Sequence, residues 1–226
     1  MRVVEVNIHP VKSTSALSVG HAAVEPWGLA HDRRFMVVDS DGVVVTAREH
    51  HDLLGVTAMP LGLGRIRLDG RHAGPIDVDA TASDEQVLVR VHKSELQARR
   101  VDAAAAASLR QLNDWIAEAA VERGEQLPKP LTMRRFRPNV VVDGSAPFAE
   151  DHWRRVTIDD VEFRVAKPCD RCVMTTVDPV TLASGKEPLR TLARYRRWDG
   201  KTWFGAYLIP DGSGHISVGG ALTATG

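Results

Sequence analysis

Residues 34–48 read RFMVVDSDGVVVTAR, two runs of mostly apolar residues separated by a short polar segment. The valine-rich runs favour β-strands, because β-branched side chains pack well on a pleated surface. Between the runs, the Asp-Gly pair within residues 39–42 supplies the backbone freedom that a tight turn needs. The stretch therefore predicts a β-hairpin.

Similar short strands are expected on both sides of this hairpin. Residues 2–8 alternate apolar and polar side chains, which is the strand periodicity. Further runs of this kind, bounded by Gly, Pro or Asp, lie at 65–70, 75–80, 86–101, 136–144, 154–166, 172–179 and 214–220. Many short strands with turn residues between them are typical of a barrel or sandwich, not of alternating β-α units.

One helix interrupts this pattern. Leu109, Leu112 and Ile116 fall at helical spacing, and the sequence predicts a helix over 103–121 with Asp102 as its N-cap. A second, short helix is expected within residues 187–197. The predicted fold class is mostly β (α+β), with any domain boundary near residues 95–105.

Composition excludes several functional classes. Lys plus Arg and Asp plus Glu number 29 each, and this balance argues against a dedicated nucleic-acid binder. No apolar run approaches the ~18 residues of a membrane span. Two cysteines in 226 residues make no disulfide framework, so we expect a cytoplasmic protein without a membrane partner.

Residues 166–179 read AKPCDRCVMTTVDP and hold both cysteines. A structural zinc site needs four ligands, commonly two such pairs, and only one pair is present. A redox dithiol needs its first Cys at a helix N-terminus, whereas the residues after Cys172 predict a strand. Two buried cysteines acting as small apolar side chains are a further interpretation, but it leaves the charges of Lys167, Asp170 and Arg171 unexplained.

The remaining interpretation makes one thiolate the ligand of a soft or redox metal, with cations that neutralise an anionic cofactor. Arginine binds phosphate through two parallel hydrogen bonds, and lysine acts as a point charge. Taken singly, each cation is most simply a solvated surface charge, so the hypothesis requires that they converge on one pocket. The candidates, each at a strand end or turn, are Lys12, Arg33, Arg34, Arg48 and Arg137.

A series of motifs, taken in order, resembles the MOSC family, the domains related to the C-terminal part of molybdenum cofactor sulfurase. The resemblance is most pronounced to the branch that holds the mitochondrial amidoxime-reducing component and its bacterial relatives. The motifs are VNIHPVKS, GLAHDRRFMVVDSDG, VTAR, FRPNVVVDG, CDRCVMTTVDP, KEPLRTLARYRR and FGAYLI followed by GHISVG.

The resemblance implies a MOSC β-barrel, residues 99–226, packed against an N-terminal β-barrel module, residues 1–98. It also implies a molybdenum cofactor, in which a pterin dithiolene and the thiolate of Cys172 hold the metal. Cys172 would thus be both the metal ligand and the catalytic residue. The cofactor-binding residues implied by the matching motifs are Lys12, Ser13, Arg33, Arg48, Arg137, Asn139, Asp170 and Arg171.

The activity implied is the reduction of small N-hydroxylated substrates, such as hydroxylamines, N-hydroxylated bases and amidoximes. The chain has no second Cys cluster for an iron–sulfur centre, so electrons are expected from a separate ferredoxin, flavodoxin or cytochrome-type protein with its reductase. The segment before Phe136 is shorter than the family usually has. An alternative is therefore a non-enzymatic module that carries sulfur or stores and delivers the cofactor.

Overall fold

The computed structural model describes residues 1–71, 73–80, 88–90 and 100–226. Most of these residues that are in regular elements lie in strands, so the mostly β class is confirmed. The α-helices are α1 Ala106–Glu122 and α2 Leu189–Tyr195, and the 3₁₀-helices are η1 His51–Gly55, η3 Met133–Arg135, η4 Ala149–Asp151 and η5 Val173–Thr176. None of the described helices has the length and apolar character needed to cross a membrane.

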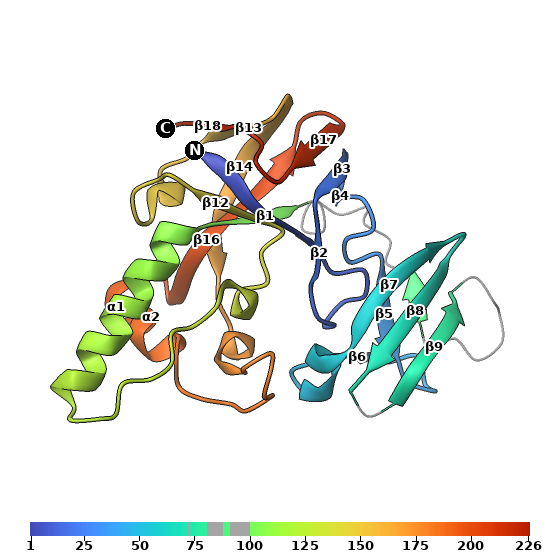
Figure 1. Cartoon of the computed structure of the whole chain (residues 1–226), viewed down its shortest axis with the longest axis horizontal. Coiled ribbons are helices and arrows are strands. Elements are labelled where there is room, and N and C mark those ends of the chain that lie inside the picture. Colours follow the sequence, from blue (N-terminus) through green and yellow to red (C-terminus); the bar gives the residue numbers. More distant parts are fainter. Residues whose placement is uncertain (72, 81–87, 91–99) are drawn as a thin grey trace.

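The strands form one large sheet and three small ones (Figure 1). Their bounds are β1 Arg2–Ile8, β2 Leu17–Val19, β3 His21–Glu25, β4 Gly28–Leu29, β5 Phe35–Val38, β6 Val44–Val45, β7 Thr57–Gly62, β8 Arg65–Gly70, β9 Ala73–Asp79, β10 Leu88–Arg90, β11 Val101–Ala105, β12 Val140–Asp143, β13 Arg155–Ile158, β14 Val161–Asp170, β15 Arg197–Trp198, β16 Lys201–Pro210, β17 Gly214–Ser217 and β18 Leu222–Thr225.

The large sheet joins the two ends of the chain. Its order is β18-β13-β14-β16-β11-β12-β1-β2, with β15 paired to β16. The small sheets have the orders β10-β5-β6, β17-β3-β4 and β7-β8-β9, and all four run from edge to edge without closing over the described residues. Because β1 pairs with β12 and β3 with β17, early and late strands share sheets. A division into 1–98 and 99–226 stays a prediction.

The predicted hairpin over residues 34–48 is confirmed. Strands β5 and β6 pair antiparallel, and Asp39 closes the turn between them. Its Oδ1 accepts hydrogen bonds from the backbone N–H groups of Asp41 at 3.0 Å and Val43 at 2.9 Å. A short acidic side chain that satisfies the turn backbone is the usual reason for Asp at such a position.

The long helix begins later than predicted. Ala103–Ala105 belong to strand β11, which lies between β16 and β12 in the large sheet. The N-cap is Ala105 and not Asp102, which lies inside the strand, so the predicted cap is wrong. Alanine has the highest helix propensity, but this preference is less than about 1 kcal/mol per residue. Strand pairing on both sides of β11 outweighs it. The short helix predicted near 187–197 is present as α2.

The strand expected over residues 172–179 is also wrong, because the segment forms the 3₁₀-helix η5. Thr175 Oγ1 donates to the carbonyl of Cys172 at 3.0 Å, and Thr176 Oγ1 donates to that of Val173 at 2.7 Å. These local hydrogen bonds offer the backbone an alternative to a strand ladder. A side chain from another segment also stabilises η5, because Arg135 Nη1 donates to Thr176 O at 3.0 Å.

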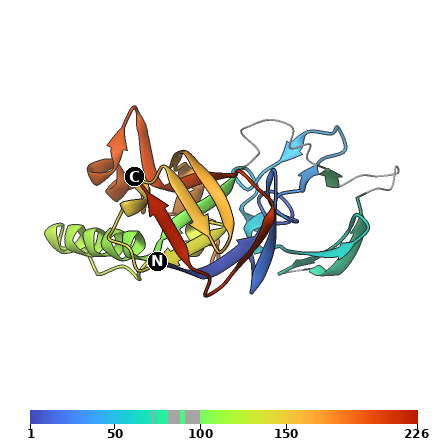
Figure 2. The ribbon, with the colours of Figure 1, turned by 90° about the horizontal axis from the view of Figure 1, so that it is seen from above.

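Two apolar clusters fix the large sheet. One cluster covers one face of the large sheet and is formed by side chains from β1, β11–β14 and β16–β18. The other packs α1 and α2 on the opposite face, where α2 contacts β16 and α1 contacts β11, β12 and α2 (Figures 1 and 2). Its fully or nearly fully buried members are Ala104, Leu112, Ile116, Met133, Phe136, Val141, Leu192 and Phe204. This second cluster anchors η3 and the residues that follow it.

Strands β16 and β11 approach each other closely at Gly205. Its φ is +77°, and a Cβ there would lie 2.7 Å from Ala103 O. Gly42 has the same φ of +77° with nothing within 4 Å, so it is a matched control. We expect Gly42→Ala to cost about 1 kcal/mol for its left-handed backbone and Gly205→Ala about 3 kcal/mol, since the added methyl overpacks the sheet.

Thermal unfolding followed by circular dichroism measures the difference, at roughly 2–4 °C of Tm per kcal/mol for a chain of this size. Equal losses in the two variants would contradict the close approach of the two strands.

Candidate functional site

A cleft of about 890 Å³ brings together residues that are far apart in the sequence. Its walls come from the loops after β1, β4 and β6, from η3 and η5, and from strands β14 and β16. Eight of the nine predicted site residues line it: Lys12, Ser13, Arg33, Arg48, Arg137, Asp170, Arg171 and Cys172. The predicted cations Lys12, Arg33, Arg48 and Arg137, which span more than a hundred residues of sequence, therefore line one cleft. The remaining candidate, Arg34, pairs with Glu25 and does not line it.

The two cysteines differ in access to this cleft. Cys169 is fully buried in β14, and burial raises the pKa of its thiol to about 11. Cys172 precedes η5, is exposed, and lines the cleft. Because the thiolate is the metal-binding and nucleophilic form, the buried Cys169 is poorly suited to either role. Of the two, Cys172 alone has a side chain that a ligand in the cleft can reach.

Arg33 is held by the protein itself. Its Nη1 donates to Asp32 Oδ2 at 2.6 Å, and its Nη2 lies 3.4 Å from Asp102 Oδ2. Nη2 also donates to the carbonyl of Arg137 at 3.1 Å. Burial lowers the pKa of Arg33, but the two carboxylates more than offset this, so that the pKa is raised overall. The charge of Arg33 is thus neutralised before any ligand arrives.

Asn139 is the one predicted residue that does not line the cleft. It is fully buried, and its Oδ1 accepts from Arg33 Nη1 at 3.0 Å and from the backbone N–H of Asp102 at 3.1 Å. Its Nδ2 donates to the carbonyl of Asn7 at 3.0 Å. Asn139 therefore positions Arg33 from behind and joins three segments of the chain.

Arg137 contrasts with Arg33. Its Nη1 donates to the carbonyl of Thr14, but within the described ranges it forms no ion pair with a carboxylate. Burial, followed by repulsion from Arg33, lowers the pKa of Arg137 to about 9. The neighbouring His9 is buried, and burial and the two arginines lower its pKa to about 3, so it is neutral at pH 7 and adds no further positive charge. An anion in the cleft would relieve this unbalanced charge.

Further polar groups in the cleft lack complete partners. Lys12 and Arg48 are exposed and form no ion pair in the part of the chain that the structure describes. Arg171 donates from Nε to Phe204 O at 2.8 Å and from Nη1 to Phe136 O at 2.9 Å. Its buried Nη2 has no hydrogen-bond partner among the residues that the structure describes. At the rim, the carboxylate of Asp170 lies 3.4 Å from Lys167 Nζ. The cleft therefore offers mainly donors and positive charge.

Backbone strain gathers at the same place. Ser13, Arg33 and Arg137 have φ values of 74°, 48° and 53°, in the left-handed region that residues other than glycine seldom adopt. Such conformations cost of order 1–3 kcal/mol each and cluster at sites where geometry serves function.

Sequence reasoning missed several contributors to the cleft. The carboxylates of Asp32 and Asp102 hold Arg33, and Arg100 lies over the Tyr207 ring at 4.4 Å. Strand register places Asp102 opposite Tyr207, and no spacing in the sequence announces that pairing. Asp32 could have been suspected from its position directly before Arg33.

Substitutions of the two arginines should differ in their effect on stability. Arg33→Gln removes one cationic partner from each of two buried carboxylates, so we expect a loss of about 3 kcal/mol in the free energy of unfolding. Arg137→Gln deprives no carboxylate of its partner and removes a repulsion, so a change within about 1 kcal/mol is expected. Urea unfolding at neutral pH measures both. Similar losses in the two variants would contradict the difference in pairing.

Arg137 also predicts a pH dependence of anion binding. Because the pKa of Arg137 is lowered to about 9, its guanidinium is charged below that pH and loses its proton above it. We therefore expect the affinity for sulfate, which does not titrate in this range, to fall as the pH rises through 9. Arg137→Gln should bind sulfate about tenfold more weakly at pH 7 and lack the pH step. Calorimetry at pH 7 and pH 10 measures this, and an identical pH profile in the variant would contradict the assignment.

Two family models match the chain. The MOSC domain matches residues 84–223, and the MOSC N-terminal beta barrel domain matches residues 1–115. Together these matches extend over nearly the whole chain.

Curated relatives agree with the models. Mitochondrial amidoxime-reducing component 1 of Mus musculus is 30% identical over 273 residues, with 96% of this chain and 80% of the relative covered. Its Homo sapiens counterpart is 30% identical over 275 residues, with 96% and 81% covered. Molybdenum cofactor sulfurase of Danio rerio is 26% identical, with 89% of this chain and 31% of that protein covered. The first two alignments exceed the 226 residues of this chain, so those relatives carry insertions. This chain belongs to the MOSC family.

Proposed function

We propose that the chain binds a molybdenum cofactor in the cleft through Cys172 and reduces N-hydroxylated compounds there. One observation carries the proposal: an exposed thiol lies in the same cleft as Lys12, Arg48 and Arg137, which form no ion pair with any described residue. A soft metal suits the thiolate, and an anionic pterin phosphate suits the cations. The names of the amidoxime-reducing relatives support this reaction class.

The residues present fit such a cofactor. Lys12, Arg48 and one side of the Arg137 guanidinium would bind its phosphate. The Nη2 of Arg171, which has no hydrogen-bond partner among the described residues, offers a donor to a polar group in the cleft. Arg33, neutralised by its carboxylates, would support this arrangement from behind.

The metal would need most of its ligands from the bound group. Among the described residues, no three His, Cys, Asp or Glu side chains are grouped so as to hold a metal ion. A cleft of about 890 Å³ falls within the size of sites that enclose organic cofactors.

The reaction would cleave the N–O bond of a hydroxylamine or amidoxime, consuming two electrons and two protons and giving an amine or amidine and water. The bound cofactor would supply the redox chemistry, and the protein would supply the thiolate, the phosphate clamp and the enclosed space. Electrons would come from a separate ferredoxin, flavodoxin or cytochrome-type protein.

A second candidate is a module that carries sulfur or stores and delivers the cofactor without turnover. The exposure of Cys172 is also consistent with this carrier role, because the outer sulfur of a persulfide on this side chain could be transferred to a partner protein. Turnover separates the candidates. The loaded chain, given reduced methyl viologen, should reduce benzamidoxime to benzamidine if it is an enzyme, and absence of product would leave the carrier.

Cys172→Ser tests the cofactor site, with Cys169→Ala as the matched control. We expect the wild-type chain, purified from a host that makes the cofactor, to contain near-stoichiometric molybdenum and pterin. Cys172→Ser should lose most of the metal and all activity, since serine is a poor soft-metal ligand. Cys169→Ala should retain both and lose only packing stability. Elemental analysis and pterin fluorescence after oxidation measure the contents, and zinc or no metal in the wild-type chain would overturn the proposal.

A further inference from the structure

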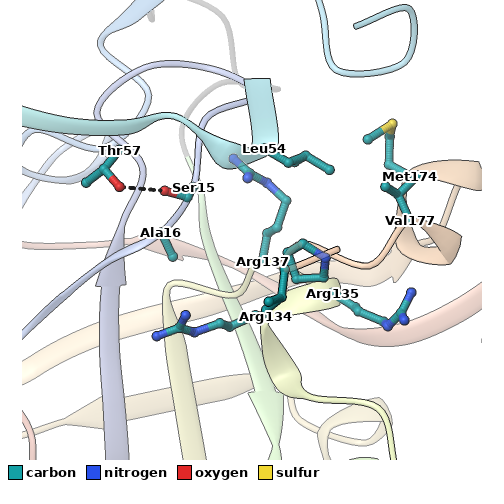
Figure 3. Close-up of a pocket in the computed structure, with 11 residues that line it drawn as sticks. Ser15, Ala16, Leu54, Thr57, Arg134, Arg135, Arg137, Met174 and Val177 are labelled. Atoms are coloured by element: carbon teal, nitrogen blue, oxygen red, sulfur yellow. Dashed lines mark hydrogen bonds between the residues drawn. The ribbon is translucent and has the colours of Figure 1, made fainter. Parts of the chain in front are cut away.

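A second, smaller cavity of about 280 Å³ opens beside the cleft (Figure 3). We call it the recess. It is lined by Ser15, Ala16, Leu54, Thr57, Arg134, Arg135, Arg137, Met174, Val177, Pro179 and Val180. None of the roles assigned above to the cleft accounts for it.

The recess adjoins the cleft, because Leu54, Arg135, Arg137 and Met174 line both. Met174 follows Cys172 by two residues, on the same 3₁₀-helix η5 that Cys172 precedes. A small molecule seated in the recess would therefore lie next to the space in front of Cys172.

The walls of the recess differ in chemistry. On one side, Ser15 Oγ lies 3.3 Å from Thr57 Oγ1, and Ser15 Oγ donates to the carbonyl of Val56 at 3.0 Å. On the other side lie the apolar side chains of Met174 and Val177 (Figure 3). Such a combination suits a molecule with one polar end and one apolar body.

Of the three described arginines that line the recess, Arg137 is the one placed to meet a ligand between its walls. Arg135 is committed, since its Nη2 donates to Asp178 Oδ2 at 2.9 Å. Arg134 and Arg135 extend to opposite sides, whereas Arg137 lies between the hydroxyl wall and the apolar wall (Figure 3). Among the described residues, none of those that line the recess is acidic, so the side of Arg137 that faces the recess meets no carboxylate there.

We propose that the recess binds the non-reacting end of the substrate, and that this end is a carboxylate on a short aromatic or aliphatic body. The carboxylate would accept hydrogen bonds from Arg137 and from the hydroxyl of Thr57, because the proton of the Ser15 hydroxyl is donated to the Val56 carbonyl. The body would pack on Met174 and Val177. Its role in substrate choice rests on the proposed function, while the binding itself does not.

Calorimetry on the full chain purified without cofactor tests the binding, with benzoate as the probe and benzamide as its neutral match. We expect benzoate to bind at least about tenfold more tightly, because hydrogen bonds to charged groups are the strong ones. Equal affinities for the two probes would overturn the proposal.

Charge exchanges at Val180 locate the bound probe. Val180 is 63% exposed, lines the recess and does not line the cleft, so folding should tolerate substitution. Val180→Glu should weaken benzoate binding about threefold to tenfold at low salt, and Val180→Lys should strengthen it. Arg48→Gln, in the cleft alone, should have little effect. If Arg48→Gln removes binding while the Val180 variants do not change it, the anion lies in the cleft and the proposal fails.

Turnover by the loaded chain tests substrate choice separately. We expect 4-carboxybenzamidoxime to have a kcat/KM about tenfold above that of benzamidoxime, and Val180→Glu to reduce the difference by raising KM. Reduction of both compounds at equal efficiency would overturn the recess assignment and leave the proposed function standing. If the chain binds benzoate selectively but reduces neither compound, the proposed function is overturned and the recess assignment stands.

Discussion

The buried ion cluster around Arg33 is the constraint on which the cleft depends. Its guanidinium contacts Asp32, Asp102, Asn139 and the carbonyl of Arg137, residues up to 106 positions away in the sequence. These contacts tie the loop after β4 to β11 and to the segment that enters β12. A buried ion pair adds little net stability against an apolar substitute, but breaking one partner leaves an uncompensated charge. The cluster therefore fixes the geometry of the cleft more than it stabilises the chain.

The cluster also determines which cations remain for a ligand. Two carboxylates neutralise the charge of Arg33. Arg137 is repelled by Arg33 and, among the described residues, forms no ion pair with a carboxylate. Lys12 and Arg48 extend the positive region toward solvent. A chain with 29 cationic and 29 acidic residues is thus neutral as a whole and strongly positive in one cavity. Such local imbalance is what a site for an anionic cofactor requires.

The hairpin at 34–48 and most of the long helix could be predicted from the sequence, because turn chemistry and helical spacing are local signals. Ala103–Ala105 could not, since their place in β11 depends on partners from β12 and β16. The turn at η5 was missed because threonine favours strands in general but here caps its own backbone. Of the candidate site, the motifs indicated which residues would gather in the cleft. Neither spacing nor composition could separate the buried Cys169 from the exposed Cys172, which differ only through strand pairing.

Arg137 is difficult to explain as a structural residue. It has left-handed backbone, lies near a like charge, and within the described chain forms no ion pair with a carboxylate, and each of these features costs stability. A glycine would remove the backbone strain. An arginine at this position is explained if a bound anion neutralises its charge, in the cleft, in the recess, or in both. Because one guanidinium borders both cavities, a ligand in one would change the electrostatic field in the other.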